Sequence, residues 1–360
     1  MTYPILHINT KQIRKNAETI RDACASAGID CTAVVKGYNA LSEITSALYD
    51  AGYRSFASSR LPHLRAVKNC FDVETMAIRI PMLSETDNLV DCADVSLNSE
   101  IETIKRIDEE ARSRNKTHKI ILMRDLGDLR EGIIDEERFM ETAVFIENNL
   151  RNIHLRGIGS NLSCYGSITP TAENLSVLVS NAREVERAIG RKLDVVSGGA
   201  STSLYLSVTG EMPEGINHLR VGAANLLRSE ARDIPEGSLE GLTDDAFIFE
   251  AEIVEIGEKP TRPTGRLGLN AFGNVRAYED RGIRRRAILA AGAFDIADYT
   301  KLIPLDEGVT LLGCSSDHLI ADIHDSKEQY RLGGTISMTM TYQSVLFATA
   351  NNLAEKRFIR

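Results

Sequence analysis

Lys36 directly follows the apolar run Thr-Ala-Val-Val of residues 32–35. Such a run predicts a buried strand, so the lysine backbone is expected in a dry strand. An amine that loses hydration has a lowered pKa, and a neutral amine can form an imine with a carbonyl group. The pattern therefore indicates that Lys36 could act as a nucleophile or base. Taken alone, it fits a strand-end lysine that extends its amine into solvent equally well.

Two glycine-containing segments have the composition of phosphate-binding loops. Residues 197–202 read Ser-Gly-Gly-Ala-Ser-Thr, and the second segment follows the run His-Leu-Arg-Val of residues 218–221. Glycines allow close backbone approach, and amides at the start of a helix favour an anion. The candidate ligands are Ser197, Gly199, Ser201, Gly222 and Ala223. Each segment is also compatible with an ordinary turn.

Eight short runs rich in apolar and β-branched residues position these groups, and stretches with helical spacing separate the runs. The runs cover residues 31–36, 55–59, 75–80, 94–98, 119–125, 154–160, 194–199 and 218–222. Strands that alternate with helices pair in parallel, and eight such units match a closed (β/α)8 barrel, expected over residues 1–240. An open doubly wound sheet competes, but the first run lacks a GxGxxG turn.

In such a barrel all βα loops open at one face. Lys36 after the first strand and the glycine segments after the seventh and eighth strands are therefore expected at the same mouth. An amine opposite a phosphate cradle is what pyridoxal 5′-phosphate requires. We therefore expect this cofactor. Arg130, Asn161 and Arg220 are further polar residues at strand ends of this face.

After residue 240 the pattern changes to strands joined by turns, with little helical spacing before Ser344. This predicts a β-rich second domain over residues 241–360. Within it, Cys314, Asp317 and His318 lie close together in the chain. Asp317 and His318 are expected in a strand, where adjacent side chains point to opposite faces.

Composition argues against several classes of protein. The formal net charge of −9 over 360 residues offers no source of attraction to nucleic acid. No apolar run has the length of a membrane span, and the start of the chain does not resemble a secretory leader. The six cysteines are scattered singly, which fits reduced thiols in a cytoplasmic protein without a structural metal.

The ordered set of segments resembles the fold-type III pyridoxal-phosphate enzymes, the alanine racemase family. VVKGYNA resembles that family's lysine motif, ILMRDLGDLREGI its fifth-strand motif, LRVGAANLL its arginine segment and TMTYQSVL its C-terminal tyrosine motif. The resemblance covers nearly the whole chain. It implies an alanine racemase-like fold with the cofactor on Lys36 and Arg220 beside the ring nitrogen. It places the remaining cofactor contacts at Tyr38, Arg130, Gly222, Ala223 and Tyr342.

Within that family the segments GDLREG, AFGNV, DRGIRRRAI and LGCSSDHLIAD resemble those of the ornithine racemases. The implied reaction interconverts the L and D forms of a free basic amino acid, ornithine first and lysine second. It needs two bases on opposite faces of Cα. Lys36 serves one face, and Asp128 or Glu131 could bind the distal ammonium group.

The base for the other face is expected from the partner subunit's second domain, which makes a homodimer necessary. The candidates are Cys314, Asp317 and His318. Three departures from alanine racemases leave this base open: Asn161 replaces a histidine, Met123 replaces a modified lysine, and LGLNAFGNV (267–275) replaces a tyrosine motif.

Other functions remain open alternatives. They are an alanine, serine or broad-specificity racemase, a metal-assisted lyase or aldolase, a non-catalytic cofactor carrier and a phosphate-sugar barrel enzyme without a cofactor. Cys314, Asp317, His318 and Asp322 can be read as a metal set, although their crowded spacing argues against it.

Overall fold

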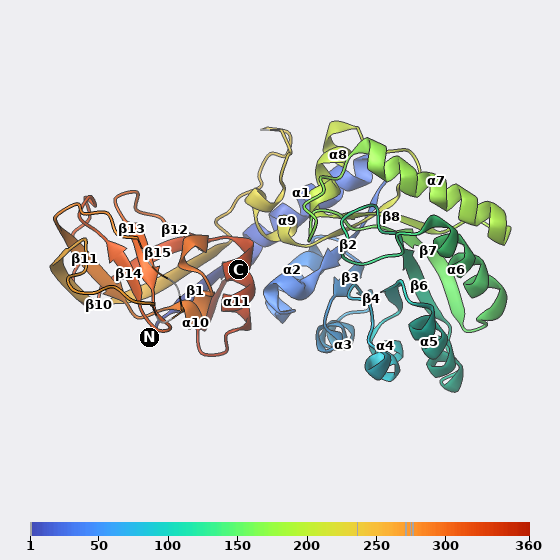
Figure 1. Cartoon of the computed structure of the whole chain (residues 1–360), viewed down its shortest axis with the longest axis horizontal. Coiled ribbons are helices and arrows are strands. Elements are labelled where there is room, and N and C mark those ends of the chain that lie inside the picture. The colour runs from blue at the N-terminus through green and yellow to red at the C-terminus, as the bar shows by residue number, and fades with distance from the viewer. Residues whose placement is uncertain (1, 236, 271, 274, 276) are drawn as a thin grey trace. The chain divides into compact units, whose positions relative to one another are not determined.

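The computed structural model describes residues 2–235, 237–270, 272–273, 275 and 277–360. The chain forms two compact units. One unit spans Lys11–Thr243, and the other joins Asp244–Arg360 to the residues up to Thr10. Figure 1 shows the elements of both units along the chain.

The unit Lys11–Thr243 is a closed barrel of eight parallel strands that follow each other in chain order. β9 pairs with β2, with Thr32 opposite Arg220, and this pairing closes the barrel. The strands are β2 (Asp30–Val34), β3 (Ser55–Ser58), β4 (Glu74–Ala77), β5 (Val95–Asn98), β6 (His118–Met123), β7 (Ile153–Gly159), β8 (Val195–Ala200) and β9 (His218–Val221). Each of the eight predicted runs overlaps one of them, so the prediction of a (β/α)8 barrel is confirmed.

Helices lie on the outside of the strands (Figure 1), and all except the first and the last of them connect consecutive barrel strands. They are α1 (Thr10–Ser26), α2 (Ser42–Asp50), α3 (Leu61–Cys70), α4 (Thr86–Cys92), α5 (Ile101–Ser113), α6 (Glu136–Asn149), α7 (Ala172–Ile189), α8 (Leu204–Thr209) and α9 (Ala223–Leu226). In α5, Ile104 and Ile107 are fully buried in the cluster that joins helices to strands, while charged residues cover the other face. Gly190, with φ 74°, ends α7 in the left-handed conformation that favours glycine.

The second unit contains an antiparallel sheet in the order β12-β15-β10-β11-β14-β13. Alternate residues of β10 are buried, namely Phe247, Phe249, Ala251 and Ile253, as expected for a strand with one face on a core. The elements are β10 (Phe247–Pro260), β11 (Ile283–Leu289), α10 (Ala293–Ile296), β12 (Leu302–Pro304), β13 (Thr310–Cys314), β14 (Leu319–Asp322), β15 (Thr335–Met340), α11 (Tyr342–Ala350) and β16 (Glu355–Ile359). The predicted β-rich domain is confirmed.

The first residues depart from the expected boundary, which placed them in the barrel. β1 (Ile5–Asn9) pairs in parallel with β16 and antiparallel with β10, so it belongs to the sheet of the second unit. Ile5, Leu6 and Ile8 are fully buried there. Within the described ranges, no helix is both long enough and apolar enough to span a membrane.

Candidate active site

Lys36 lies just beyond β2, in a 3-10 turn formed by Val35–Tyr38. The expectation that its backbone continues the strand is therefore wrong, because the chain turns once β2 ends at Val34. The pKa of Lys36 is lowered, first because burial disfavours the ammonium form, and also by the positive charges of Arg130 and Arg220. Cys164 and Glu131 act in the opposite direction. Five polar groups from four segments of the chain are thus electrostatically coupled at the C-terminal face of the barrel.

Tyr38 ends the same turn and is fully buried. Its hydroxyl is hydrogen-bonded to Thr45 Oγ1 at 3.3 Å, and burial raises its pKa. This hydrogen bond ties the end of the turn that carries Lys36 to α2.

Arg220 lies in β9 and is 3% exposed. Its guanidinium donates hydrogen bonds to Ser197 Oγ and to the Ser160 carbonyl oxygen, the latter at 2.8 Å. Burial lowers its pKa to about 10, so the side chain stays charged at neutral pH. A fixed cation therefore lies among strands β7, β8 and β9.

The loops that follow β8 and β9 are held together by Ser201. Its Oγ accepts hydrogen bonds from the backbone amides of Gly222 at 3.2 Å and Ala224 at 3.4 Å. Gly199 has φ 122°, and a Cβ there would lie 2.6 Å from Ser203 Oγ, so the position requires glycine. The predicted phosphate ligands Ser201, Gly222 and Ala223 are thus neighbours at one end of the barrel.

Polar atoms without a protein partner lie after β7. Ser160 Oγ and Asn161 Nδ2 are buried and have no hydrogen-bond partner in the described part of the chain. Buried polar atoms are normally satisfied, so these two indicate a place where a polar group is bound. This observation fits a cofactor at the mouth of the barrel. Met123, where alanine racemases have a modified lysine, is buried in an apolar cluster.

Asp128 has a structural environment that the sequence did not reveal. It is 1% exposed, and its two carboxylate oxygens accept hydrogen bonds from the backbone amides of Ser163 at 3.0 Å and Tyr165 at 3.1 Å. It therefore ties the loop after β6 to the loop after β7. Glu131 instead forms an ion pair with Arg130, beside Lys36. Of the two predicted ammonium ligands, Glu131 is the one that the structure brings to the lysine.

Cys164 is a residue of this site that sequence reasoning missed. It lies between the two amides that Asp128 holds, and its thiol is close enough to Lys36, Arg130 and Arg220 to interact with them electrostatically. The cysteine is exposed and unpaired by disulfide. Its position in a loop without periodicity left no signal in the sequence.

The candidates for the second base, which come from the second unit, lie in a hairpin. Cys314 ends β13, and Asp317 and His318 are exposed in the turn before β14. The expectation that Asp317 and His318 occupy a strand is wrong. The Ser315 amide donates to the His318 carbonyl oxygen at 2.8 Å, and Ser315 Oγ accepts from the His318 amide at 3.1 Å, which closes the turn.

Tyr342 and the segment 267–275 are the other regions of the second unit that the sequence singled out. Tyr342 begins α11 and is half-buried. Within the segment 267–275, Ala271 and Asn274 lie outside the described residues. The described part of the chain holds no group of three or more His, Cys, Asp or Glu side chains that could bind a metal ion.

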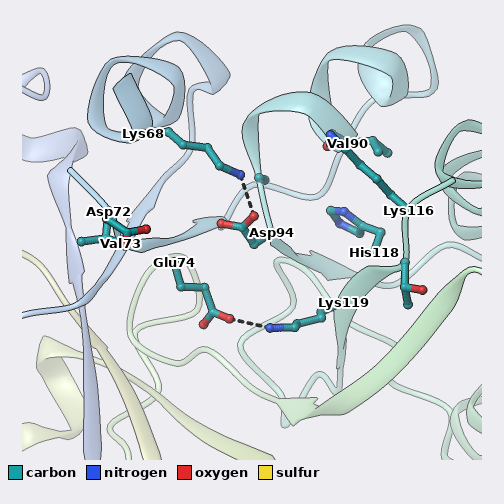
Figure 2. Close-up of a pocket in the computed structure, with 11 residues that line it drawn as sticks. Lys68, Asp72, Val73, Glu74, Val90, Asp94, Lys116, His118 and Lys119 are labelled. Atoms are coloured by element: carbon teal, nitrogen blue, oxygen red, sulfur yellow. Dashed lines mark hydrogen bonds and ion pairs between the residues drawn. The ribbon is translucent and has the colours of Figure 1, made fainter. Parts of the chain in front are cut away.

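A surface hollow at the opposite, N-terminal ends of β4, β5 and β6 is lined by paired charges (Figure 2). Lys68 bonds to Asp94 at 2.6 Å, and Lys119 bonds to Glu74 at 2.9 Å. Figure 2 shows His118 to one side of these pairs, near Lys116. In parallel barrels the reactive groups lie at the C-terminal face of the strands, whereas residues at the N-terminal face contribute to stability. We therefore assign the residues of this hollow a structural role.

Comparison with known proteins extends over the whole chain. Residues 8–227 match the family described as alanine racemase, N-terminal domain. The chain belongs to this family. An ornithine racemase from Acetoanaerobium sticklandii is 41% identical over 358 residues, which cover 99% of this chain and 100% of that protein. A lysine racemase from Thermotoga maritima is 37% identical, with 99% of this chain and 98% of that protein covered.

Solved structures show the same fold. An alanine racemase from Clostridium difficile 630 has a TM-score of 0.75 at 15% identity, covering 100% of this chain and 96% of that chain. A D-threonine aldolase from Filomicrobium marinum has a TM-score of 0.73 at 13% identity, covering 97% and 89%. The alanine racemase family and its fold, predicted from the sequence, are thereby confirmed. The full-length relatives also confirm the predicted class of enzyme, an isomerase that racemises amino acids.

Proposed function

We propose that this member of the alanine racemase family interconverts the L and D forms of a basic amino acid, ornithine first and lysine second, with pyridoxal 5′-phosphate as its cofactor. The observation that carries the proposal is the partly buried Lys36, whose pKa is lowered by burial and by the positive charges of Arg130 and Arg220. The names of the two full-length relatives support the choice of substrate.

The residues at the barrel mouth suit this cofactor. Lys36 would hold its aldehyde carbon and Arg220 would donate to the ring nitrogen. Ser201, Gly222 and Ala223 would bind the phosphate, and Tyr342 is a further proposed phosphate contact. The remaining proposed contacts are Tyr38, Arg130, Asn161, Ser197 and Gly199. When bound, the cofactor withdraws electrons and so acidifies the substrate Cα–H bond.

Lys36 is the proposed base for one face of the substrate. Its lowered pKa leaves a larger neutral fraction at physiological pH than an exposed lysine has, and only the neutral amine can accept a proton. Arg220 remains charged at neutral pH. It would donate a hydrogen bond to the cofactor ring nitrogen and keep its proton, so this nitrogen would stay unprotonated and side reactions would be restrained.

Two sets of residues are candidates for the base on the opposite face of the substrate Cα. Cys314, Asp317 and His318 lie at an exposed hairpin that a second copy of the chain can reach, as a homodimer would require. Cys164 is the alternative within the same barrel, because it lies in electrostatic reach of Lys36. Separate replacement of Cys164 and of the hairpin residues distinguishes them by which change abolishes racemisation, since Lys36 alone can still exchange the Cα proton of one enantiomer.

A basic side chain on the substrate needs a carboxylate, and we assign this role to Glu131 rather than Asp128. Glu131 acts electrostatically on Lys36 and Arg220, and its ion-pair partner is the solvent-accessible side chain of Arg130. Both oxygens of Asp128, in contrast, accept hydrogen bonds from backbone amides in the interior. We also place the protein in the cytoplasm, which the six free cysteines support.

The test is kcat/KM on L-ornithine, L-lysine, L-arginine, L-alanine and L-serine, measured by chiral chromatography with added pyridoxal 5′-phosphate. We expect ornithine to lead and alanine to be slow, because an empty ammonium site leaves a carboxylate unpaired. If alanine or serine leads, the basic substrate is wrong. If no amino acid is racemised and no visible absorption band forms, the whole proposal fails.

A further inference from the structure

A chain of hydrogen bonds runs through the barrel interior from Arg220 to Ser55, the first residue of β3. Arg220 donates to Ser197 Oγ, which lies 2.8 Å from His218 Nδ1. His218 Nε2 lies 2.9 Å from Thr32 Oγ1, which is 2.8 Å from Ser55 Oγ. Ser197, Thr32 and Arg220 are at most 3% exposed, and His218 is 7% exposed.

Strand geometry explains how these side chains meet. His218 and Arg220 are two residues apart in β9, so their side chains leave the same face of the strand. Ser197 of β8 pairs with His218, and Thr32 of β2 pairs with Arg220. The polar chain is therefore built into the register of three neighbouring strands.

The permanently charged guanidinium fixes the direction of every bond in this chain. A guanidinium can only donate, so Ser197 Oγ must accept from Arg220. The single proton of the Ser197 hydroxyl then goes to His218 Nδ1, because any other direction leaves it buried without an acceptor. His218 must carry its own proton on Nε2 and donate it to Thr32 Oγ1, and Thr32 donates to Ser55.

A neutral imidazole is required for this arrangement. Burial, followed by the positive charges of Arg220 and Arg156, lowers the pKa of His218 to about 3. The ring therefore stays neutral across the physiological range. It can accept at one nitrogen while it donates at the other.

We infer that His218, acting through Ser197, is a positioning residue for Arg220: it orients the Ser197 lone pair towards the guanidinium and so fixes the cation at the ring nitrogen of the cofactor. The inference rests on the proposed function for the role of Arg220. The guanidinium is held on two sides, by Ser197 Oγ and by the Ser160 carbonyl oxygen. Its remaining N–H groups are left for the ring nitrogen.

His118 provides a matched control in the same barrel. It is the first residue of β6, as His218 is of β9, and it is buried with its Nε2 2.9 Å from Ser96 Oγ. Burial lowers its pKa to about 4. Within the described ranges, no hydrogen bond of the His118 side chain leads to Arg220. Its replacement therefore carries the general cost of removing a buried histidine without the effect on the cation.

The first experiment uses the protein without cofactor. Nitrogen NMR of ¹⁵N-histidine-labelled protein, with His218→Asn for assignment, should show His218 protonated on Nε2, unprotonated on Nδ1 and not titrating between pH 8 and pH 5. A proton on Nδ1, or titration in this range, overturns the inference. This result is independent of catalysis.

The second experiment compares variants of the cofactor-loaded protein. His218→Leu and Ser197→Ala should share an altered visible spectrum and raise transamination relative to racemisation about tenfold. His218→Asn should stay close to wild type, because its amide oxygen can replace Nδ1 as the acceptor for Ser197. His118→Leu should lower the thermal midpoint without changing spectrum or ratio.

The outcomes separate the two proposals. If the wild type forms no visible band with pyridoxal 5′-phosphate, the proposed function fails and the role of His218 fails with it. If the band forms and Arg220→Glu alters it, while His218→Leu leaves spectrum and ratio unchanged, only the positioning role is overturned.

Discussion

The reactivity expected of Lys36 comes mainly from burial, because desolvation is the leading cause of its lowered pKa. Lys36→Ala should reduce racemisation by about 10²-fold to 10⁴-fold, the usual contribution of a general base. Borohydride reduction of the loaded protein should attach the cofactor to Lys36, as mass spectrometry of its peptides would show. Attachment to a different lysine would contradict the assignment.

Asp128 and Glu131 carry the same charge and lie three residues apart, yet their surroundings predict different effects. Glu131→Gln should lower the preference for ornithine over norvaline, which lacks only the distal amine, by about 10-fold to 100-fold. Asp128→Asn should reduce kcat/KM for both substrates alike, because it loosens the backbone around Ser163 and Tyr165. The ratio of the two kcat/KM values is the measurement, and a change in ratio with Asp128→Asn alone would reverse the assignment.

At the scale of elements, the buried histidines that begin β6 and β9 make the barrel sensitive to acid. The pKa of His118 is about 4 when folded, against about 6.5 in an unfolded chain. Between pH 6.5 and pH 4, His118 binds a proton in the unfolded state but stays neutral in the folded state. The free energy of unfolding therefore decreases as the pH falls towards 4. For His118 this loss amounts to about 3 kcal/mol.

Chemical denaturation at a series of pH values measures this effect. His118→Asn should be less stable than wild type at pH 7, and the difference in unfolding free energy should shrink between pH 6.5 and pH 4. A difference that does not vary with pH would show that His118 is protonated equally in both states.

The barrel strands could be predicted because each is a short apolar run between helical stretches, a pattern that local sequence carries. β1 and β16 could not, because their pairing joins residues 5–9 to residues 355–359. Asp317 and His318 were expected in a strand since they precede an apolar run, but Ser315 closes a turn there. The roles of Asp128, Cys164 and His218 depend on contacts between different loops and strands, which no local pattern encodes.

At the scale of the whole molecule, a shared active site would place Lys36 and the hairpin of Cys314, Asp317 and His318 on different copies of the chain. The barrel site contains the proposed base for one face, and the hairpin presents its candidate groups to solvent. A homodimer in which each chain completes its partner's site would then contain two identical sites.

Mixing two inactive variants tests this arrangement. Lys36→Ala and the double variant Asp317→Ala/His318→Ala should each be inactive, but a mixed dimer would have one site with neither substitution. Random pairing makes half of the dimers mixed, so activity should recover to about a quarter of wild type. The mixture is assayed after mild dissociation and reassociation, with subunit exchange confirmed by native mass spectrometry. If both variants are inactive and exchange occurs without recovery, the site is not shared between copies of the chain. If the double variant alone is already active, the hairpin does not hold the second base, and Cys164→Ala should then abolish racemisation.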